Sequence, residues 1–155
     1  MANELFTAVR SKDFEKIKNL LSTGIEMDGS DSLILAIHLG NIKIVKLLVA
    51  HGADINLAEV GNGDTPLMRA AWKGFDNIVK FLLEEGAQIN KVNKYGWTAL
   101  MLAATEGRVK VVKHLLEKGA DPKIVGFKPE GVTALSTAQT FNHINVVELL
   151  TQQQK

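Results

Sequence analysis

One short phrase occurs twice in this chain of 155 residues. It reads Thr-Pro-Leu-Met-Arg-Ala-Ala at 65–71 and Thr-Ala-Leu-Met-Leu-Ala-Ala at 98–104, so its copies begin 33 residues apart. Two further residues separate each copy from a glycine, which is Gly74 or Gly107. A fixed period of this length is typical of a repeat array, in which short units stack and bury their apolar faces on one another. In such an array we expect function to lie on a surface rather than in a catalytic cleft.

Weaker copies of the pattern extend over nearly the whole chain. The glycine or its equivalent recurs at Lys12, Gly40, Gly74, Gly107 and Asn142. A second marker, Gly-Ala or the degenerate Gly-Ile, recurs at 24–25, 52–53, 86–87 and 119–120. We therefore predict one domain, 1–155, made of five units with approximate limits 3–27, 28–60, 61–93, 94–127 and 128–155.

Each unit has the composition of two short helices. In the third unit Thr65 can cap the first free N–H groups of a helix over 66–73, and Pro66 suits its first position. Gly74 suits the left-handed conformation that ends a helix. Apolar residues at 78, 79, 82 and 83 then follow helical spacing, which predicts a second helix over 76–83. A turn-rich connector leads into the next unit.

These features resemble the ankyrin-repeat family, whose repeat has this period and a Thr-Pro-Leu-His phrase. The resemblance implies an all-α solenoid of five helix-turn-helix units joined by short β-hairpin-like connectors. The family's histidine, which helps to tie neighbouring loops by hydrogen bonds, is absent from every unit. Its place is taken by Phe6, Ile34, Met68, Met101 and Ser136. We expect apolar packing to substitute for it.

The connectors differ in length. The first is about five residues short, which predicts a truncated hairpin, while residues 59–63 and 124–130 contain one and about two extra residues. Insertions in repeat arrays map to loops, often on the binding face.

The resemblance also implies which residues line the concave face of the stack. Both tryptophans and the single tyrosine fall in this set, and large aromatic side chains are the usual anchors of protein interfaces. The predicted partner-binding residues are Trp72, Lys73, Lys94, Tyr95, Trp97, Glu106 and Phe141. The alternative is that the rings only fill gaps between units. Arg69 could meet a partner's carboxylate or pair internally, and we favour internal pairing.

Composition and motifs argue against other classes of function. The net charge of +1 and the interleaved acidic residues give no basis for nucleic-acid binding, and no apolar run approaches the ~20 residues of a membrane helix. The chain has no cysteine, and its four histidines lack the spacing of a helical metal pair. Gly61-x-Gly63 lacks the rest of a phosphate-binding loop, and no nucleophile motif is present.

We therefore predict a protein-interaction module without catalytic activity, cofactor or metal, acting as a cytoplasmic monomer on a protein partner. The alternative is a regulatory or inhibitory subunit of an enzyme or a transcription factor, using the same surface. A designed binder is a third possibility, although irregular connectors and missing histidines argue against idealised repeats.

Overall fold

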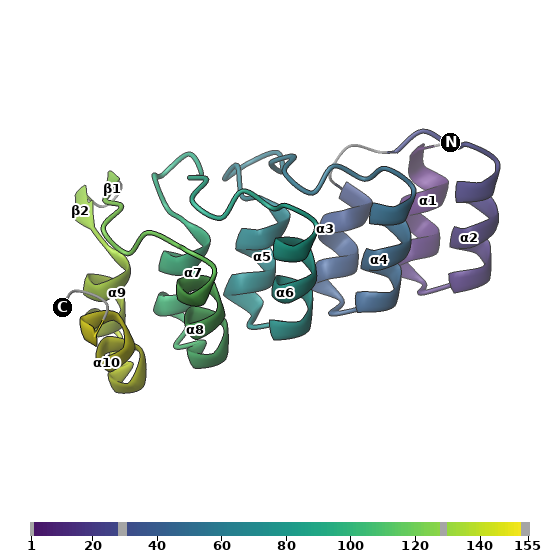
Figure 1. The fold of residues 1–155 in the computed structure, drawn as a ribbon. Coiled ribbons are helices and arrows are strands. Elements are labelled where there is room, and N and C mark those ends of the chain that lie inside the picture. The colour runs from purple at the N-terminus through teal and green to yellow at the C-terminus, as the bar shows by residue number, and fades with distance from the viewer. Residues whose placement is uncertain (1, 28–30, 128–129, 153–155) are drawn as a thin grey trace.

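Helices arranged in pairs make up most of the molecule. The computed structural model describes residues 2–27, 31–127 and 130–152. Its helices are α1 (Ala2–Arg10), α2 (Phe14–Ser22), α3 (Asp31–His38), α4 (Ile42–Ala50), α5 (Pro66–Lys73), α6 (Asp76–Glu84), α7 (Ala99–Thr105), α8 (Val109–Glu117), α9 (Ala134–Thr140) and α10 (Ile144–Gln152). Consecutive pairs stand side by side in one row, with the N-terminal pair at one end and the C-terminal pair at the other (Figure 1). The predicted all-α solenoid of five helix-turn-helix units is confirmed.

The first helices of neighbouring pairs pack together more extensively than the second helices do. The reason is the small pair of residues in the repeated phrase, because Ala70 and Ala71 of α5 and Ala103 and Ala104 of α7 are fully buried. Alanine lets two helix backbones approach closely, whereas the second helices meet through bulkier valine, isoleucine and leucine side chains. One continuous apolar core therefore runs along the stack, from Leu5 in α1 to Leu150 in α10.

Threonine side chains begin three of the first helices. Thr65, Thr98 and Thr133 accept hydrogen bonds from the backbone N–H groups of Met68, Met101 and Ser136, at 3.3, 3.2 and 3.1 Å. Pro66 lies at the start of α5, where a backbone N–H group would have no partner within the helix. Proline lacks that group and therefore costs no hydrogen bond there. The capping predicted from the repeated phrase is thus confirmed.

The glycine that ends the first helix is also a contact point for the next unit. Gly40, Gly74 and Gly107 have positive φ angles of 63°, 79° and 63°. Against each lies the residue that precedes the second helix of the following unit, namely Phe75, Arg108 and His143. A Cβ atom on Gly107 would lie 2.6 Å from Nδ1 of His143. Glycine is therefore required twice over here, by the backbone conformation and by the neighbouring side chain.

The connectors fold into three fingers on the upper side of the stack (Figure 1). In the first finger (59–64) the N–H group of Glu59 donates to the carbonyl of Asp64, and in the second (93–97) that of Asn93 donates to Trp97. In the third (126–127 and 130–132), strands β1 (Gly126–Phe127) and β2 (Glu130–Val132) pair antiparallel. The connectors are hairpin-like, as predicted. The predicted truncation of the earliest connector involves residues 28–30, which lie outside the described residues.

Gly107→Ala should destabilise the stack more than Gly119→Ala does. Both glycines have positive φ angles, so either substitution should cost about 1 to 2 kcal/mol of backbone strain. Only at Gly107 would the new methyl group also collide with the next unit, which adds about 1 to 3 kcal/mol, because no atom lies within 4 Å of a Cβ on Gly119. Urea unfolding followed by circular dichroism measures both. Equal losses of stability would refute this role of Gly107.

Candidate interaction surface

Hydrogen bonds join the three fingers edge to edge. The N–H group of Lys94 donates to the carbonyl of Asn62 at 3.0 Å, and the Tyr95 hydroxyl donates to Oδ1 of Asn62 at 3.3 Å. The N–H group of Phe127 donates to the carbonyl of Tyr95 at 3.2 Å. We call these four residues the fingertip ridge. Its two rings reach solvent, since Tyr95 is 41% exposed and Phe127 is 54% exposed.

A buried polar pair supports the ridge from below. The Asn93 side chain donates from Nδ2 to Oδ1 of Asp64 at 2.6 Å, although the two residues are 29 positions apart. Oδ1 of Asn93 accepts the N–H groups of Tyr95 and Trp97 at 2.9 and 3.0 Å. Asp64 and Asn93 are only 4% and 8% exposed, so these bonds are shielded from water.

Packing at the place of the missing histidine is apolar in the third and fourth units, as expected. Met68 and Met101 are indeed buried in the histidine's place, and the sulfur of Met68 accepts the N–H group of Thr65 at 3.4 Å. Neither thioether can bridge two loops by strong hydrogen bonds, however, because sulfur is a weak acceptor and carries no donor. The Asp64–Asn93 pair supplies a buried side-chain hydrogen bond between the first and second fingers, in addition to the bonds that Asn62 accepts.

Arg69 pairs internally, as we favoured from the sequence. Its Nε donates to Oε2 of Glu59 at 3.1 Å and lies 3.4 Å from Oδ2 of Asp64. A second contact joins its Nη2 to Glu59. Burial acts to lower the pKa of Arg69, but the hydrogen bond with Glu59 and the charge of Asp64 outweigh it and raise the pKa. The guanidinium is therefore held as a cation between two carboxylates at the foot of the first finger.

The predicted partner-binding residues fall into two groups. Lys94, Tyr95 and Trp97 belong to the second finger, at the start of the first helices. The others, at the opposite ends of α5, α7 and α9, are Trp72, Lys73, Glu106 and Phe141. The eight residues of α5 separate these levels by about 12 Å at 1.5 Å per residue. The structure therefore spreads the predicted aromatic centre over two levels of the stack.

The two tryptophans are both partly buried. Trp97 packs against the hydrophobic core. The ring of Trp72 lies under Lys73, whose Nζ is 5.0 Å from the ring centroid, and its carbonyl accepts a hydrogen bond from Nε of Arg108 at 3.2 Å. Both rings thus contribute to packing within the stack, in addition to the area that they leave exposed.

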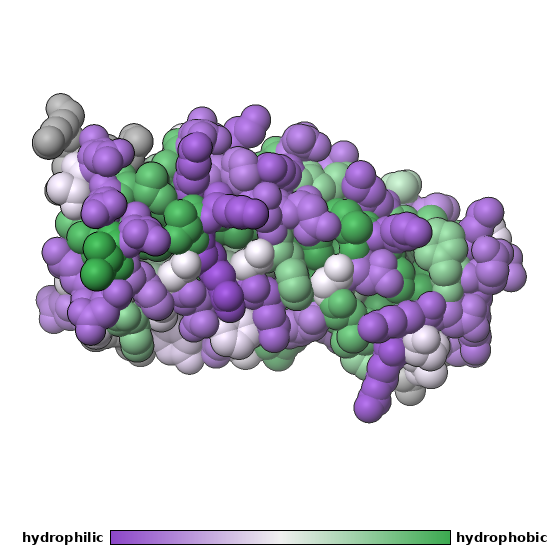
Figure 2. All heavy atoms as spheres, turned by 90° about the horizontal axis from the view of Figure 1, so that it is seen from below, coloured by the Kyte–Doolittle hydropathy of each residue, from purple (hydrophilic) through white to green (hydrophobic). Residues whose placement is uncertain are grey.

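The remaining predicted residues lie near the base of the stack. Nη2 of Arg108 lies 3.8 Å from a carboxylate oxygen of Glu106. Phe141 is 55% exposed and stacks on His143, with 6.4 Å between ring centroids. The base, seen from below in Figure 2, mixes hydrophobic and hydrophilic atoms across its surface. We therefore place the candidate surface mainly on the fingers, where exposed apolar side chains follow one another from finger to finger.

Sequence reasoning missed two exposed residues of the fingers. Val60 at the tip of the first finger is 95% exposed, and Phe127 lies on the ridge. Both belong to connectors that contain extra residues, and these insertions are the signal in the sequence that points to them. Neither is a tryptophan or a tyrosine, and neither lies at a position that the family resemblance assigns to the concave face.

The histidines act within the fold. His143 donates from Nε2 to the carbonyl of Thr105 at 2.8 Å, and His51 donates from Nδ1 to that of Leu47 at 2.8 Å. His114 of α8 contacts the carboxylate of Asp76 in α6. Within the described part of the chain, no group of three histidine, aspartate or glutamate residues is placed to hold a metal ion. In that same part, no helix is long and apolar enough to cross a bilayer.

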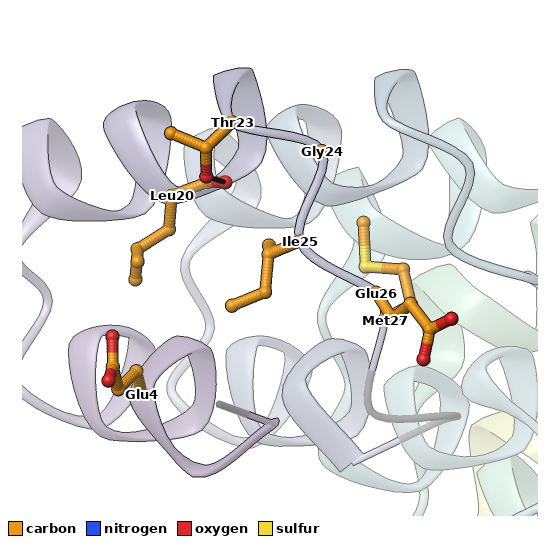
Figure 3. A pocket seen from close by; sticks show the side chains of 7 residues that line it. All are labelled: Glu4, Leu20, Thr23, Gly24, Ile25, Glu26 and Met27. Carbon is orange, nitrogen blue, oxygen red and sulfur yellow. Dashed lines mark hydrogen bonds between the residues drawn. The ribbon is translucent and has the colours of Figure 1, made fainter.

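A hollow of about 450 Å³ opens at the N-terminal end of the stack. Leu20, Ile25 and Glu4 point toward one another there, from α2, the following connector and α1 (Figure 3). Leu20 has the same position in its unit as Leu48 of α4 has in the next unit, and Leu48 is completely buried. The hollow thus lies at the N-terminal end of the described apolar core, and it is separate from the fingers.

The family model described as ankyrin repeats matches this chain in three overlapping copies, over residues 5–93, 58–126 and 89–155. Ankyrin repeat and SAM domain-containing protein 6 of Rattus norvegicus is 40% identical over 102 residues, which cover 62% of this chain and 12% of the relative. NF-kappa-B inhibitor cactus of Drosophila melanogaster is 41% identical over 63 residues, covering 41% of this chain and 13% of cactus. The chain therefore spans only a small part of the length of these relatives.

Asn93→Ala should loosen the fingers and destabilise the stack by about 2 to 3 kcal/mol, because it leaves a buried carboxylate and two N–H groups without this partner. Asn90→Ala is the matched control, since Asn90 accepts one exposed hydrogen bond, from Asp121, and should cost about 1 kcal/mol or less. Chemical unfolding gives the stabilities, and amide exchange at Tyr95 and Trp97 reports the fingers. Unchanged exchange in the Asn93 variant would contradict the supporting role.

Proposed function

This chain belongs to the ankyrin-repeat family, and on that premise we propose that it is a protein-interaction module whose partner docks on the fingertip ridge and the adjoining concave face. The observation that carries the proposal is the ridge itself, which presents two exposed aromatic rings on a frame of hydrogen bonds between fingers. Ankyrin repeats generally mediate protein-protein interactions, which agrees with this proposal.

The ridge has the physical properties of a binding surface. Aromatic side chains bury a large area on contact and lose little conformational freedom, so they supply much of the free energy of association. The frame beneath them is already ordered by the Asp64–Asn93 pair and by the ion pairs of Arg69. A partner would therefore meet a surface that needs little reorganisation, which reduces the entropic cost of binding.

The predicted residues have distinct places in this proposal. Tyr95 would be the central anchor, with Lys94 beside it and Trp97 as partly buried support. The lower group of Trp72, Lys73, Glu106 and Phe141 would meet a partner that extends across the concave face. Lys73 and Glu106 have opposite charges and would set its orientation rather than its affinity.

Removal of the two rings should abolish capture of the partner. Affinity purification with the wild type is compared with the double variant Tyr95→Ala/Phe127→Ala, and a captured protein is then titrated against both. Loss of two anchors should weaken binding at least tenfold, because each anchor contributes about 1 to 2 kcal/mol. Phe14→Ala is the matched control, since Phe14 is also an exposed phenylalanine but lies on α2, away from the fingers. Equal capture of the partner by the wild type and by the double variant would contradict the proposal.

A regulatory or inhibitory subunit is the second candidate. The observation that favours it is the similarity to cactus, which is named as an NF-kappa-B inhibitor. The two candidates differ in their effect on the partner. Addition of this chain to the captured protein should change its enzymatic or DNA-binding activity if the chain is inhibitory. If binding saturates without any change in the activity of the captured protein, the inhibitory role is excluded and the role of an interaction module remains.

A further inference from the structure

A separate pocket of about 320 Å³ lies between the inner helices α1 and α3 and the first finger. Phe6 of α1 and Ile34 and Leu35 of α3 give it an apolar lining. Val60 forms its lip and is almost fully exposed, although valine gains free energy from being buried. We call this hollow the α3 pocket. The residues that line it belong to the first two units, whereas the exposed rings of the fingertip ridge lie on the second and third fingers.

The first finger holds Val60 in place over the pocket. Glu59, which directly precedes it, is bound by Arg69 of α5, and its N–H group donates to the carbonyl of Asp64 at 2.9 Å. Asp64 in turn is bonded to Asn93 of the second finger. The position of the lip is thus fixed by the same polar contacts that support the ridge.

The charged groups lining the pocket are both acidic. Glu59 is already paired with Arg69, while Asp31 at the start of α3 has no ion pair with any described residue. His38 also lines the pocket, and its pKa is lowered by burial and by the nearby charges of Arg69 and Lys73. Positive charge therefore lies near the His38 end of α3, whereas Asp31 lies at the other end of this helix, where a cation would meet a carboxylate. An apolar hollow beside a carboxylate that forms no ion pair within the described part of the chain suits a ligand with an apolar part and a positive charge next to it.

We propose that the α3 pocket binds a large apolar side chain of the protein partner, placed next to a lysine or arginine that reaches Asp31. This inference rests on the proposed function, because it names the chemistry of the partner at one part of the concave face. The apolar side chain would cover Val60 and Leu35 and so remove their exposed surface from water. The cation would add specificity more than affinity, since ion pairs at exposed sites are weak.

A random peptide library displayed on phage, selected on the wild-type chain, tests the proposal without a known partner. Enriched peptides are synthesised with a fluorescent label, and their affinities are measured by fluorescence polarisation. We expect enriched peptides in which a large apolar residue adjoins lysine or arginine. Val60→Ser and Leu35→Gln should each weaken their binding about tenfold, because an apolar contact is lost. Asp31→Asn should weaken it about two- to fivefold, and added salt should reduce that difference.

Matched variants separate the pocket from the ridge. Val125→Ser makes the same change at an exposed valine beside the third finger and should leave binding unchanged. Circular dichroism of each variant checks that the stack is folded, and Val60→Ser replaces a side chain that packs on nothing essential to the core. Peptides that lose affinity only for Tyr95→Ala/Phe127→Ala would overturn the α3 pocket and leave the proposed function intact. An acidic consensus would likewise overturn it, and a selection that enriches no peptide would contradict both proposals.

Discussion

Each helical pair in this stack is too small to bury its own apolar side chains, so every unit depends on the one beside it. The closest of these contacts run between the first helices, where buried alanines let backbones approach, and at Gly40, Gly74 and Gly107, where the next unit lies against the glycine. Both contacts repeat along the chain, because both belong to the repeated phrase or to the glycine that follows it. The single row of helical pairs that carries the fingers follows from them.

The fingers depend on a second kind of contact, which is polar and not repeated. Asp64, Asn93, Glu59 and Arg69 form a partly buried network that joins the first finger to the second finger and to α5. Buried polar groups are stable only when their partners are in place, so such a network fixes geometry more strictly than apolar packing does. Here it holds both the ridge and the lip of the α3 pocket, which makes the two proposed contact areas parts of one rigid surface.

That surface is asymmetric along the stack. The third finger presents Phe127, the second presents Tyr95, and the first presents Val60 above an acidic, apolar hollow. A partner that crossed all three fingers would thus meet aromatic rings at one end and a pocket for an apolar side chain at the other. Such a difference between ends could fix the direction in which an extended partner segment binds.

The sequence by itself determined the architecture, because its local signals repeat: the helical period recurs in five units, and the threonine cap and the glycine stop each recur in three. It also indicated the finger-bearing side of the stack and the internal pairing of Arg69, whose neighbouring carboxylates lie close in the chain. Only the tertiary structure decided which rings stay exposed, how the predicted binding residues divide between two levels, and which polar side chains join the first two fingers. Asp64 meets Asn93 across 29 positions, and Val60 and Phe127 lie in insertions that break the period. Contacts of this kind follow from how neighbouring units pack, which no repeating pattern in the chain records.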